Sequence, residues 1–173
     1  MQLGFQVKAL VRDPQKAGQL SHPNIELVTG NLSDQDALRQ VSSGCRAVIH
    51  GAGAVRGSSQ AAFDLVNING TAAIIAAVKS QQAPPRLLLL SSLAAREPQL
   101  SWYAQSKRGA EQLLQKEQQL DWIILRPPAV YGPGDKEMLP VFQMMSRGVA
   151  AVPGATEARI SLIHVTDLVE AII

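Results

Sequence analysis

Short apolar runs alternate along this chain with longer stretches in which apolar and polar residues recur at helical spacing. The short runs are almost continuously apolar, which is typical of parallel strands that are covered on both faces. We therefore predict strands at Phe5–Val11, Ile25–Val28, Arg46–His50, Arg86–Ser91 and Trp122–Leu125.

The stretches between these runs have the pattern of helices. Ser33 followed by Asp34 marks a helix start, because acids favour the positive end of the helix dipole. Gln60–Lys79 is a long candidate helix whose middle is weakened by the Asn-Ile-Asn-Gly of residues 67–70, and Tyr103–Gln119 is the clearest helix. Strands alternating with helices predict an α/β fold with a parallel sheet and right-handed crossovers. Since no linker divides the chain, we predict one domain over residues 1–173.

Composition excludes several classes of protein. The chain has 173 residues, of which 46% are hydrophobic and 17% charged, so it can bury a core and is not intrinsically disordered. A net charge of +2 and 4% aromatic residues give no indication of nucleic-acid binding. The apolar runs Ala72–Val78 and Leu87–Leu90 are far shorter than the roughly 20 residues of a membrane helix. We expect a cytoplasmic protein with no membrane partner, and leave a homodimer open.

Cysteine and histidine give no sign of a metal site. Cys45 is alone, so the chain has no intrachain disulfide. His22, His50 and His164 are widely spaced, and no metal-ligand pattern surrounds them. We predict no bound metal, and a structural role for His50 at a strand end.

Tyr103 and Lys107 form the sharpest local feature, because residues four apart on a helix lie on the same face. An ammonium group beside a phenol favours the phenolate form, and such a tyrosine can act as a general acid or base toward a carbonyl or an alcohol. The pattern is permissive, however, and the pentapeptide alone favours a packed tyrosine and a solvated lysine.

Two serines precede this helix. Ser91 and Ser92 follow a predicted strand, and ligands of open α/β sheets bind outside the carboxyl ends of strands. A hydroxyl at that edge can hold a substrate oxygen. Taken alone, such a pair is more often part of a loop or a helix cap.

Ser-Ser followed by Tyr-x-x-x-Lys resembles the catalytic arrangement of the short-chain dehydrogenase/reductases. Further segments resemble the extended, epimerase/dehydratase-like branch of that family, and they occur in the family's order over nearly the whole chain. These segments are Phe5–Asp13, Val28–Asp34, Val48–Gly53, Asn67–Thr71, Leu125–Gly134 and Ile163–Leu168. The resemblance implies a Rossmann-like, doubly wound parallel sheet that binds NAD(P).

The resemblance also implies roles for particular residues. Tyr103 would be the acid/base, Lys107 would bind the nicotinamide ribose, and Ser92, rather than Ser91, would orient the substrate oxygen. Asn67 would lie near the site, although a helix-interior Asn bonded to backbone fits equally well. The remaining residues implied to contact the cofactor are Asn31, Leu32, Gly51, Ala52, Gly53, Pro127, Pro128 and Val130.

Arg12 indicates which dinucleotide is preferred. In the family, NAD-dependent members tend to have an acid after the second strand, which accepts a hydrogen bond from the ribose 2′-hydroxyl. Here Val11 is followed by Arg12, and a guanidinium matches a phosphate. We predict that NADP(H) is preferred over NAD(H), with help from Lys16. The alternatives are a surface Arg12 paired with Asp13, and some use of NAD through that acid.

The chain departs from the family pattern in one important respect. The glycine-rich phosphate loop, G-x-x-G-x-x-G, is absent, and Asn31 replaces the family's usual Asp. We expect a partial Rossmann domain that lacks its first strand, its phosphate loop and the C-terminal substrate region. The edges of Phe5–Val11 and Arg46–His50 would then lack their shared partner, unless they pair directly.

The reaction that the resemblance implies is hydride transfer between NADP(H) and a carbonyl or alcohol carbon of a small molecule. Epimerase or dehydratase chemistry on a nucleotide sugar is an alternative within the family. A dinucleotide-sensing module without catalysis is a second alternative, favoured by the missing phosphate loop and opposed by an intact Ser92, Tyr103 and Lys107.

Overall fold

The computed structural model describes residues 4–149 and 159–173. They belong to two compact units, Met1–Arg126 and Pro127–Ile173. The two units are described separately below, and the prediction of a single domain stays a prediction.

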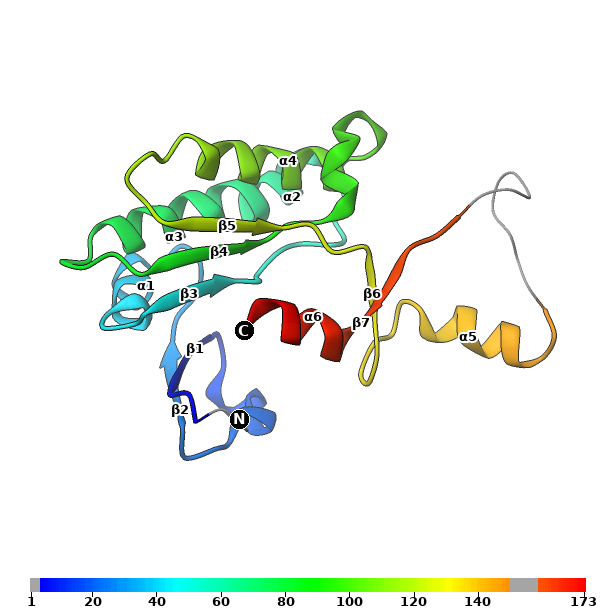
Figure 1. The fold of residues 1–173 in the computed structure, drawn as a ribbon, viewed down its shortest axis with the longest axis horizontal. Coiled ribbons are helices and arrows are strands. Elements are labelled where there is room, and N and C mark those ends of the chain that lie inside the picture. Colours follow the sequence, from blue (N-terminus) through cyan, green and yellow to red (C-terminus); the bar gives the residue numbers. More distant parts are fainter. Residues whose placement is uncertain (1–3, 150–158) are drawn as a thin grey trace. The chain divides into compact units, whose positions relative to one another are not determined.

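The first unit contains two parallel sheets (Figure 1). One pairs β1 (Val7–Val11) with β2 (Ile25–Thr29). The other has the order β3–β4–β5, formed by β3 (Ala47–His50), β4 (Arg86–Leu90) and β5 (Trp122–Leu125). The predicted strands therefore all form, and the predicted α/β class with parallel strands is confirmed.

Two helices of this unit begin at a side-chain cap, the first of them at the predicted position. The Asp34 side chain accepts a hydrogen bond from the Ala37 amide at 3.0 Å and starts α1 (Gln35–Ser42). Ser101 does the same for α4 through the Ala104 amide at 3.1 Å. Helix α4 spans Trp102–Gln115 and ends before the predicted Gln119. Short 3-10 helices are found at Pro14–Lys16, Gly18–Leu20, Leu93–Arg96 and Pro98–Leu100.

The predicted helix Gln60–Lys79 forms, and its weak middle has a structural counterpart. It consists of α2 (Gln60–Asp64), a π-helical turn over Leu65–Asn69, and α3 (Gly70–Lys79). Among the described helices, this stretch is long and apolar enough to cross a membrane by length and composition alone. A core helix of a soluble protein passes the same test, and Ile74 and Val78 of α3 are core residues.

The core lies between helices α3 and α4 and one face of the β3–β4–β5 sheet (Figure 1). Leu87 and Leu89 point from β4 into it and pack with Val78 and Leu114, which are completely buried. Each such side chain contributes about 1.5–3 kcal/mol through burial of apolar surface. This packing fixes α4 against the end of β4, where the predicted catalytic residues lie.

One edge of β1 and one edge of β3 have no strand partner in residues 4–149 and 159–173. Each of these strands has a single neighbour, β2 and β4 respectively. The side chain of Ile49 in β3 is 57% exposed. The structure therefore bears out the prediction of unpaired edges, and direct pairing of the two does not occur.

Most described elements of the second unit are not predicted from the sequence; the exception is the helix Val165–Ile172, in which the apolar helical pattern of Val169–Ile173 lies. Strand β6 (Ala129–Tyr131) pairs in parallel with β7 (Leu162–His164), and the described residues of this unit also form α5 (Leu139–Ser146) and α6 (Val165–Ile172). The ring of Tyr131 packs against those of Phe142 and His164, with centroids 5.5 and 5.2 Å away. Strands of three residues carry too little apolar pattern to be predicted.

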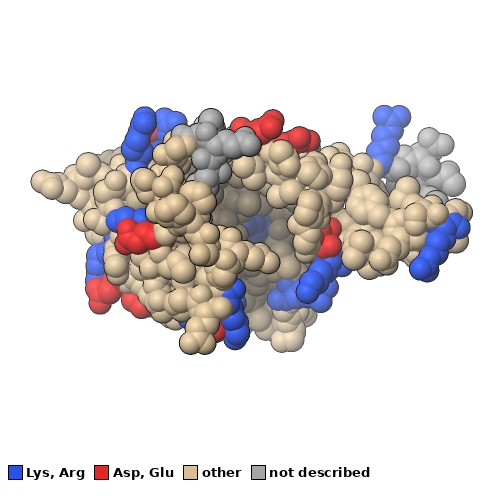
Figure 2. Space-filling view, turned by 90° about the horizontal axis from the view of Figure 1, so that it is seen from below, with Lys and Arg blue, Asp and Glu red and all other residues tan. Residues whose placement is uncertain are grey.

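Charged side chains of both signs are scattered over the face shown in Figure 2. Lysines and arginines stand in separate groups among uncharged residues, and no continuous basic surface covers the described part of this face. This distribution matches a chain with a net charge of only +2.

Candidate active site

Helix α4 presents Tyr103 and Lys107 one turn apart, on the same face. Tyr103 is half-buried and meets the ring of Phe63 edge-on, with centroids 6.2 Å apart. Within residues 4–149 and 159–173, its hydroxyl has no hydrogen-bond partner. The phenol is therefore available to a bound molecule.

Lys107 is buried, with 6% of its surface exposed, so it is not a solvated surface lysine. Its Nζ donates a hydrogen bond to the Leu90 carbonyl at 2.6 Å, at the carboxyl end of β4. Burial lowers the pKa of Lys107 below its usual value, and the negative charge of Glu111 opposes that shift. The lysine is thus held at the edge of the sheet where ligands of α/β proteins bind.

The two serines after β4 have different surroundings. Ser91 is buried, and its hydroxyl donates to Glu111 Oε1 at 2.6 Å. Ser92 is partly exposed, and its oxygen accepts a hydrogen bond from the Ala94 amide at 3.2 Å, which leaves its own O–H free to donate. Ser92 is therefore the serine with a hydroxyl that a ligand can use.

The loop after β3 carries Gly51, Ala52 and Gly53, all exposed. Asn67 holds this loop from the π-helical turn: its side chain bonds the Ala54 amide at 2.7 Å and the Ala54 carbonyl at 3.1 Å. A Cβ on Gly53 would lie 3.0 Å from Asn67 Oδ1 and 3.7 Å from Lys107 Nζ. Gly53 thus permits a close approach of this loop to the lysine.

Asn67 also connects the loop to the helix that carries the tyrosine. Its Nδ2 donates to Ser106 Oγ at 2.8 Å, and Ser106 donates to the Tyr103 carbonyl at 2.8 Å. Asn67 therefore lies next to the site, as expected, and its side chain is satisfied by backbone and by Ser106 rather than directed at a ligand.

Arg12 follows β1 with its side chain exposed and makes no ion pair or hydrogen bond with the described residues. Asp13 does not pair with it. Instead, Asp13 accepts a hydrogen bond from the Gln15 amide at 3.0 Å and forms an ion pair with Lys16 at 3.3 Å. The alternative of a surface Arg12 paired with Asp13 is therefore wrong, and the guanidinium is free to bind an anion.

Asn31 and Leu32 follow β2. The Asn31 side-chain oxygen Oδ1 accepts hydrogen bonds from the Ser33 amide and hydroxyl, at 2.8 and 2.6 Å, which leaves the side-chain NH₂ free to donate. Leu32 packs over Gly70, where a Cβ would lie 2.7 Å from Leu32 Cδ1. Leu32 thus connects the end of β2 to the start of α3.

Pro127, Pro128 and Val130 belong to the second unit, and Val130 pairs with Ile163 in its sheet. Their predicted contact with a cofactor rests on the resemblance.

His50 lies at the end of β3, where it is buried, and its Nε2 is 3.1 Å from Thr71 Oγ1. Burial, with a smaller effect of the Lys107 charge, lowers the pKa of His50 to about 4. The ring is therefore neutral at neutral pH and ties β3 to α3.

We expect the free energy of unfolding to fall in acid because of His50. Its folded pKa lies below the unfolded value of 6.5, so the unfolded chain binds more protons at pH values between the two. The contribution of neutral His50 to the free energy of unfolding is fully present above pH 6.5. Up to about 3 kcal/mol of it is lost as the pH falls to about 4. Urea unfolding of wild type and His50→Gln at several pH values measures this loss. His22→Gln, in an exposed loop, is the control and should keep the wild-type pH dependence of the free energy of unfolding. The same pH dependence in His50→Gln would show that His50 does not cause the loss.

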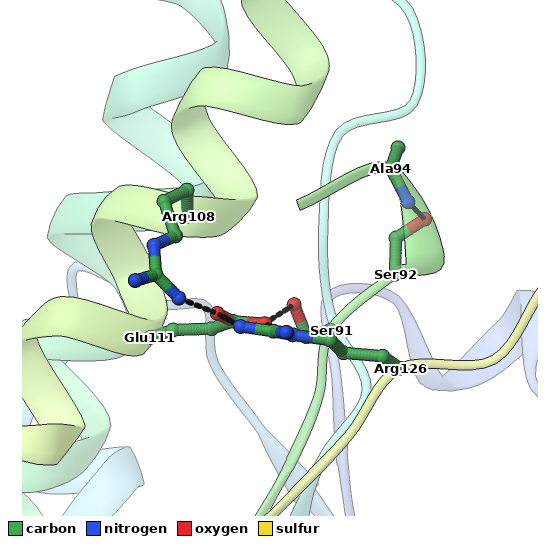
Figure 3. A network of polar contacts seen from close by, with 6 residues as sticks. All are labelled: Ser91, Ser92, Ala94, Arg108, Glu111 and Arg126. Carbon is green, nitrogen blue, oxygen red and sulfur yellow. Dashed lines mark hydrogen bonds and ion pairs between the residues drawn. The ribbon is translucent and has the colours of Figure 1, made fainter. Parts of the chain in front are cut away.

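Glu111 is a further residue beside the site that is not predicted from the sequence. Its carboxylate is completely buried, and it receives hydrogen bonds from Ser91, Arg108 and Arg126 (Figure 3). Burial raises the pKa of Glu111, but the hydrogen bonds from Arg126, Ser91 and Arg108 outweigh it, so that the pKa is lowered and the group stays charged. The signal was the spacing, since Glu111 follows Lys107 by one turn on the face that carries Tyr103.

The described residues fit parts of a dinucleotide. Lys107, the close approach of Gly53 and the free Tyr103 hydroxyl suit a ribose and a reacting ring, and the free Arg12 guanidinium suits a phosphate. For the pyrophosphate, no glycine-rich turn of the G-x-x-G-x-x-G type occurs in the sequence.

A family described as NAD(P)H-binding matches residues 1–162 of this chain. A ceramide reductase of Caulobacter vibrioides is 39% identical over 170 residues, which cover 95% of this chain and 51% of that protein. A decarboxylating sterol-4-alpha-carboxylate 3-dehydrogenase of Candida albicans is 25% identical over 158 residues, covering 79% of this chain and 45% of that protein. The chain thus spans about half the length of these curated relatives.

Solved structures share the fold. The dTDP-glucose 4,6-dehydratase DesIV of Streptomyces venezuelae, with NAD bound, superposes with a TM-score of 0.75 at 19% identity, over 96% of this chain and 61% of that one. WbmG of Bordetella bronchiseptica, in complex with NAD and UDP, gives a TM-score of 0.77 at 14% identity, over 99% and 60%. These similarities confirm the predicted Rossmann-like arrangement.

Proposed function

The chain belongs to the NAD(P)H-binding family, in the short-chain dehydrogenase/reductase and epimerase/dehydratase group, and on that basis we propose that it is the catalytic part of a reductase. The proposed reaction is hydride transfer between NADP(H) and a carbonyl or alcohol carbon. The observation that carries the proposal is the Tyr103–Lys107 pair, with Lys107 buried at the carboxyl end of β4 and the Tyr103 hydroxyl unpartnered among the described residues.

In the proposed reaction, residues of this chain would transfer the proton and hydrogen-bond the substrate oxygen. When bound, the nicotinamide supplies a hydride to the carbonyl carbon or accepts one from the alcohol carbon. Tyr103 would donate its hydroxyl proton to the carbonyl oxygen during reduction and take a proton back during oxidation. Lys107 would stabilise the resulting phenolate by its charge. Ser92 would donate its O–H to the same substrate oxygen, since its oxygen already accepts a hydrogen bond from the Ala94 amide and its proton has no partner among the described residues.

We propose a lipid carbonyl as the substrate class. The support is the ceramide reductase at 39% identity and the sterol carboxylate dehydrogenase at 25% identity, whose names both refer to lipids. We propose no nucleic-acid partner. The lysines and arginines on the face shown in Figure 2 are scattered and form no continuous basic surface in its described part.

Nicotinamide turnover tests this proposal. The experiment uses the longest natural reading frame that contains these residues, called the complete protein below. The substrate is a keto-ceramide, a ceramide with a ketone in place of one of its alcohol groups. With NADPH and this substrate, we expect a net loss of the reduced-nicotinamide absorbance as the ketone is reduced. Conversion of a nucleotide sugar without net absorbance change would indicate an epimerase instead. Binding of NADPH without either conversion would indicate a sensing module.

We expect Arg12→Gln to weaken binding of NADPH but not of NADH. A charge-assisted hydrogen bond to the 2′-phosphate contributes about 1.5–3 kcal/mol, which corresponds to about tenfold to a hundredfold in affinity. Calorimetric titration of the complete protein with each cofactor measures the difference. Arg46→Gln, an exposed arginine next to β3, serves as the control. An equal loss for both cofactors would show that Arg12 does not contact the 2′-phosphate.

A further inference from the structure

Glu111 connects three segments that each lie next to a residue of the proposed site. It stands one turn after Lys107 on α4. From the end of β4, Ser91 donates its hydroxyl to Oε1 at 2.6 Å. From the end of β5, Arg126 donates Nε to Oε1 at 2.7 Å and Nη2 to Oε2 at 2.5 Å (Figure 3). One buried carboxylate thus joins a helix and two strand ends.

Ser91 links the hydrogen bonds of Glu111 to the proposed site. It lies between Leu90, whose carbonyl holds Lys107 Nζ, and Ser92, whose hydroxyl is free to donate. Its backbone is fixed as well, because its amide bonds the Leu125 carbonyl at 2.7 Å. Any shift of Ser91 would therefore move both the partner of the lysine and the second serine.

We propose that Glu111 is a positioning residue of the site: by binding Ser91 and Arg126, it holds the Leu90 carbonyl, and the Lys107 ammonium bonded to it, at the carboxyl end of β4. This inference rests on the proposed function for its effect on turnover. Its structural part, the placement of Lys107, is independent of the reaction.

Stability alone does not account for this arrangement. Burying a carboxylate with arginines costs desolvation that the attraction between the charges roughly offsets, and apolar side chains of similar size often serve a fold equally well. The four hydrogen bonds to Glu111 do satisfy the charge, but three of them come from the ends of β4 and β5 and the fourth from Arg108 on α4, and none comes from the core residues around Leu87 and Leu114. The carboxylate is placed where it orders the site.

The charge of Glu111 has a second effect, on the protonation of Lys107. Burial lowers the pKa of this lysine, and Glu111 counteracts the shift. The other groups around the pair are Arg108 on α4, Arg126 after β5, and His50 at the end of β3, which is neutral at neutral pH. Without the carboxylate, the two arginines would be left unpaired beside Lys107, and its pKa would fall further.

Glu111→Gln tests the proposal, because an amide keeps the size of the side chain and removes its charge. We expect kcat of the complete protein to fall about tenfold to a hundredfold, as for a small displacement of a catalytic group, with a smaller change in KM. We also expect NMR titration of the Lys107 Nζ signal to give a lower pKa than in wild type. Glu117→Gln, which removes an acid paired with Lys79 at 2.8 Å, is the matched control and should change neither.

Ser91→Ala keeps the test valid if Glu111→Gln does not fold. It removes one hydrogen bond to Glu111 and leaves the charge, so we expect kcat to fall about twofold to tenfold while the pKa of Lys107 stays at its wild-type value. Wild-type kcat and an unchanged Lys107 titration in Glu111→Gln would overturn the proposal. A wild-type protein without turnover would overturn the proposed function only, since the Lys107 titration needs no substrate.

Discussion

Tyr103→Phe in the complete protein should lower kcat for lipid-ketone reduction by about 10²–10⁴-fold, the usual contribution of a general acid. The substitution removes only the hydroxyl, and the ring keeps its contact with Phe63. Within the described residues the hydroxyl has no hydrogen-bond partner, so its loss leaves no buried group unpaired. We therefore expect affinity for NADPH and the unfolding temperature to change little.

Trp102→Phe is the matched control for this prediction. Trp102 precedes Tyr103 on α4 and is 51% exposed, so its substitution tests an aromatic change at the same helix start. It should keep wild-type kcat. Near-wild-type turnover by Tyr103→Phe would show that the proton is transferred by another group, and would remove the basis for the assignment.

The 173-residue chain by itself should bind NADPH only weakly. Pyrophosphate binding depends on backbone N–H groups of a glycine-rich turn at a helix N-terminus, and the G-x-x-G-x-x-G pattern does not occur in this sequence. The free edges of β1 and β3 also favour association with other chains over a stable monomer. Arg12 and Lys107 alone cannot replace the missing phosphate contacts.

Titration of the purified 173-residue chain with NADPH measures this directly, through the fluorescence of Trp102 and Trp122 and by calorimetry. A thermal melt of the same sample reports whether the chain folds cooperatively. Micromolar or tighter binding by a cooperatively folded monomer would contradict the prediction. It would show that another segment, such as the loop 51–57, contacts the phosphates.

The pattern of apolar and polar residues predicts most of the structure of the first unit, because the sequence of each element specifies that element locally. Apolar runs such as Leu87–Leu90 become buried strands, and Asp34 caps the helix that its position indicates. Even the π-helical turn at Leu65–Asn69 has a sequence signal, in the Asn-Ile-Asn-Gly that weakens the helix. The short strands β6 and β7 could not be predicted, because three residues carry no clear periodicity and their pairing is set by tertiary contacts.

Helical spacing predicts the part of the candidate site that lies on a single helix. Tyr103 and Lys107 share a face of α4, and the preference for Ser92 over Ser91 agrees with the free hydroxyl of Ser92. Spacing could not reveal that Lys107 is buried on the Leu90 carbonyl, nor that Asp13 pairs with Lys16 and leaves Arg12 free. Such facts depend on contacts between segments far apart in the sequence, or on the conformation of a loop.

Transfer of a hydride label tests the central claim most directly. The complete protein is incubated with a lipid ketone and NADPH deuterated at the transferring position of the nicotinamide ring, and the product alcohol is analysed by mass spectrometry. The proposed function predicts that one deuterium appears on the carbinol carbon, at a rate that falls about 10²–10⁴-fold in Tyr103→Phe. Binding of the labelled cofactor without deuterium in any product, from lipid ketones or nucleotide sugars alike, would contradict the claim that this chain is part of an oxidoreductase.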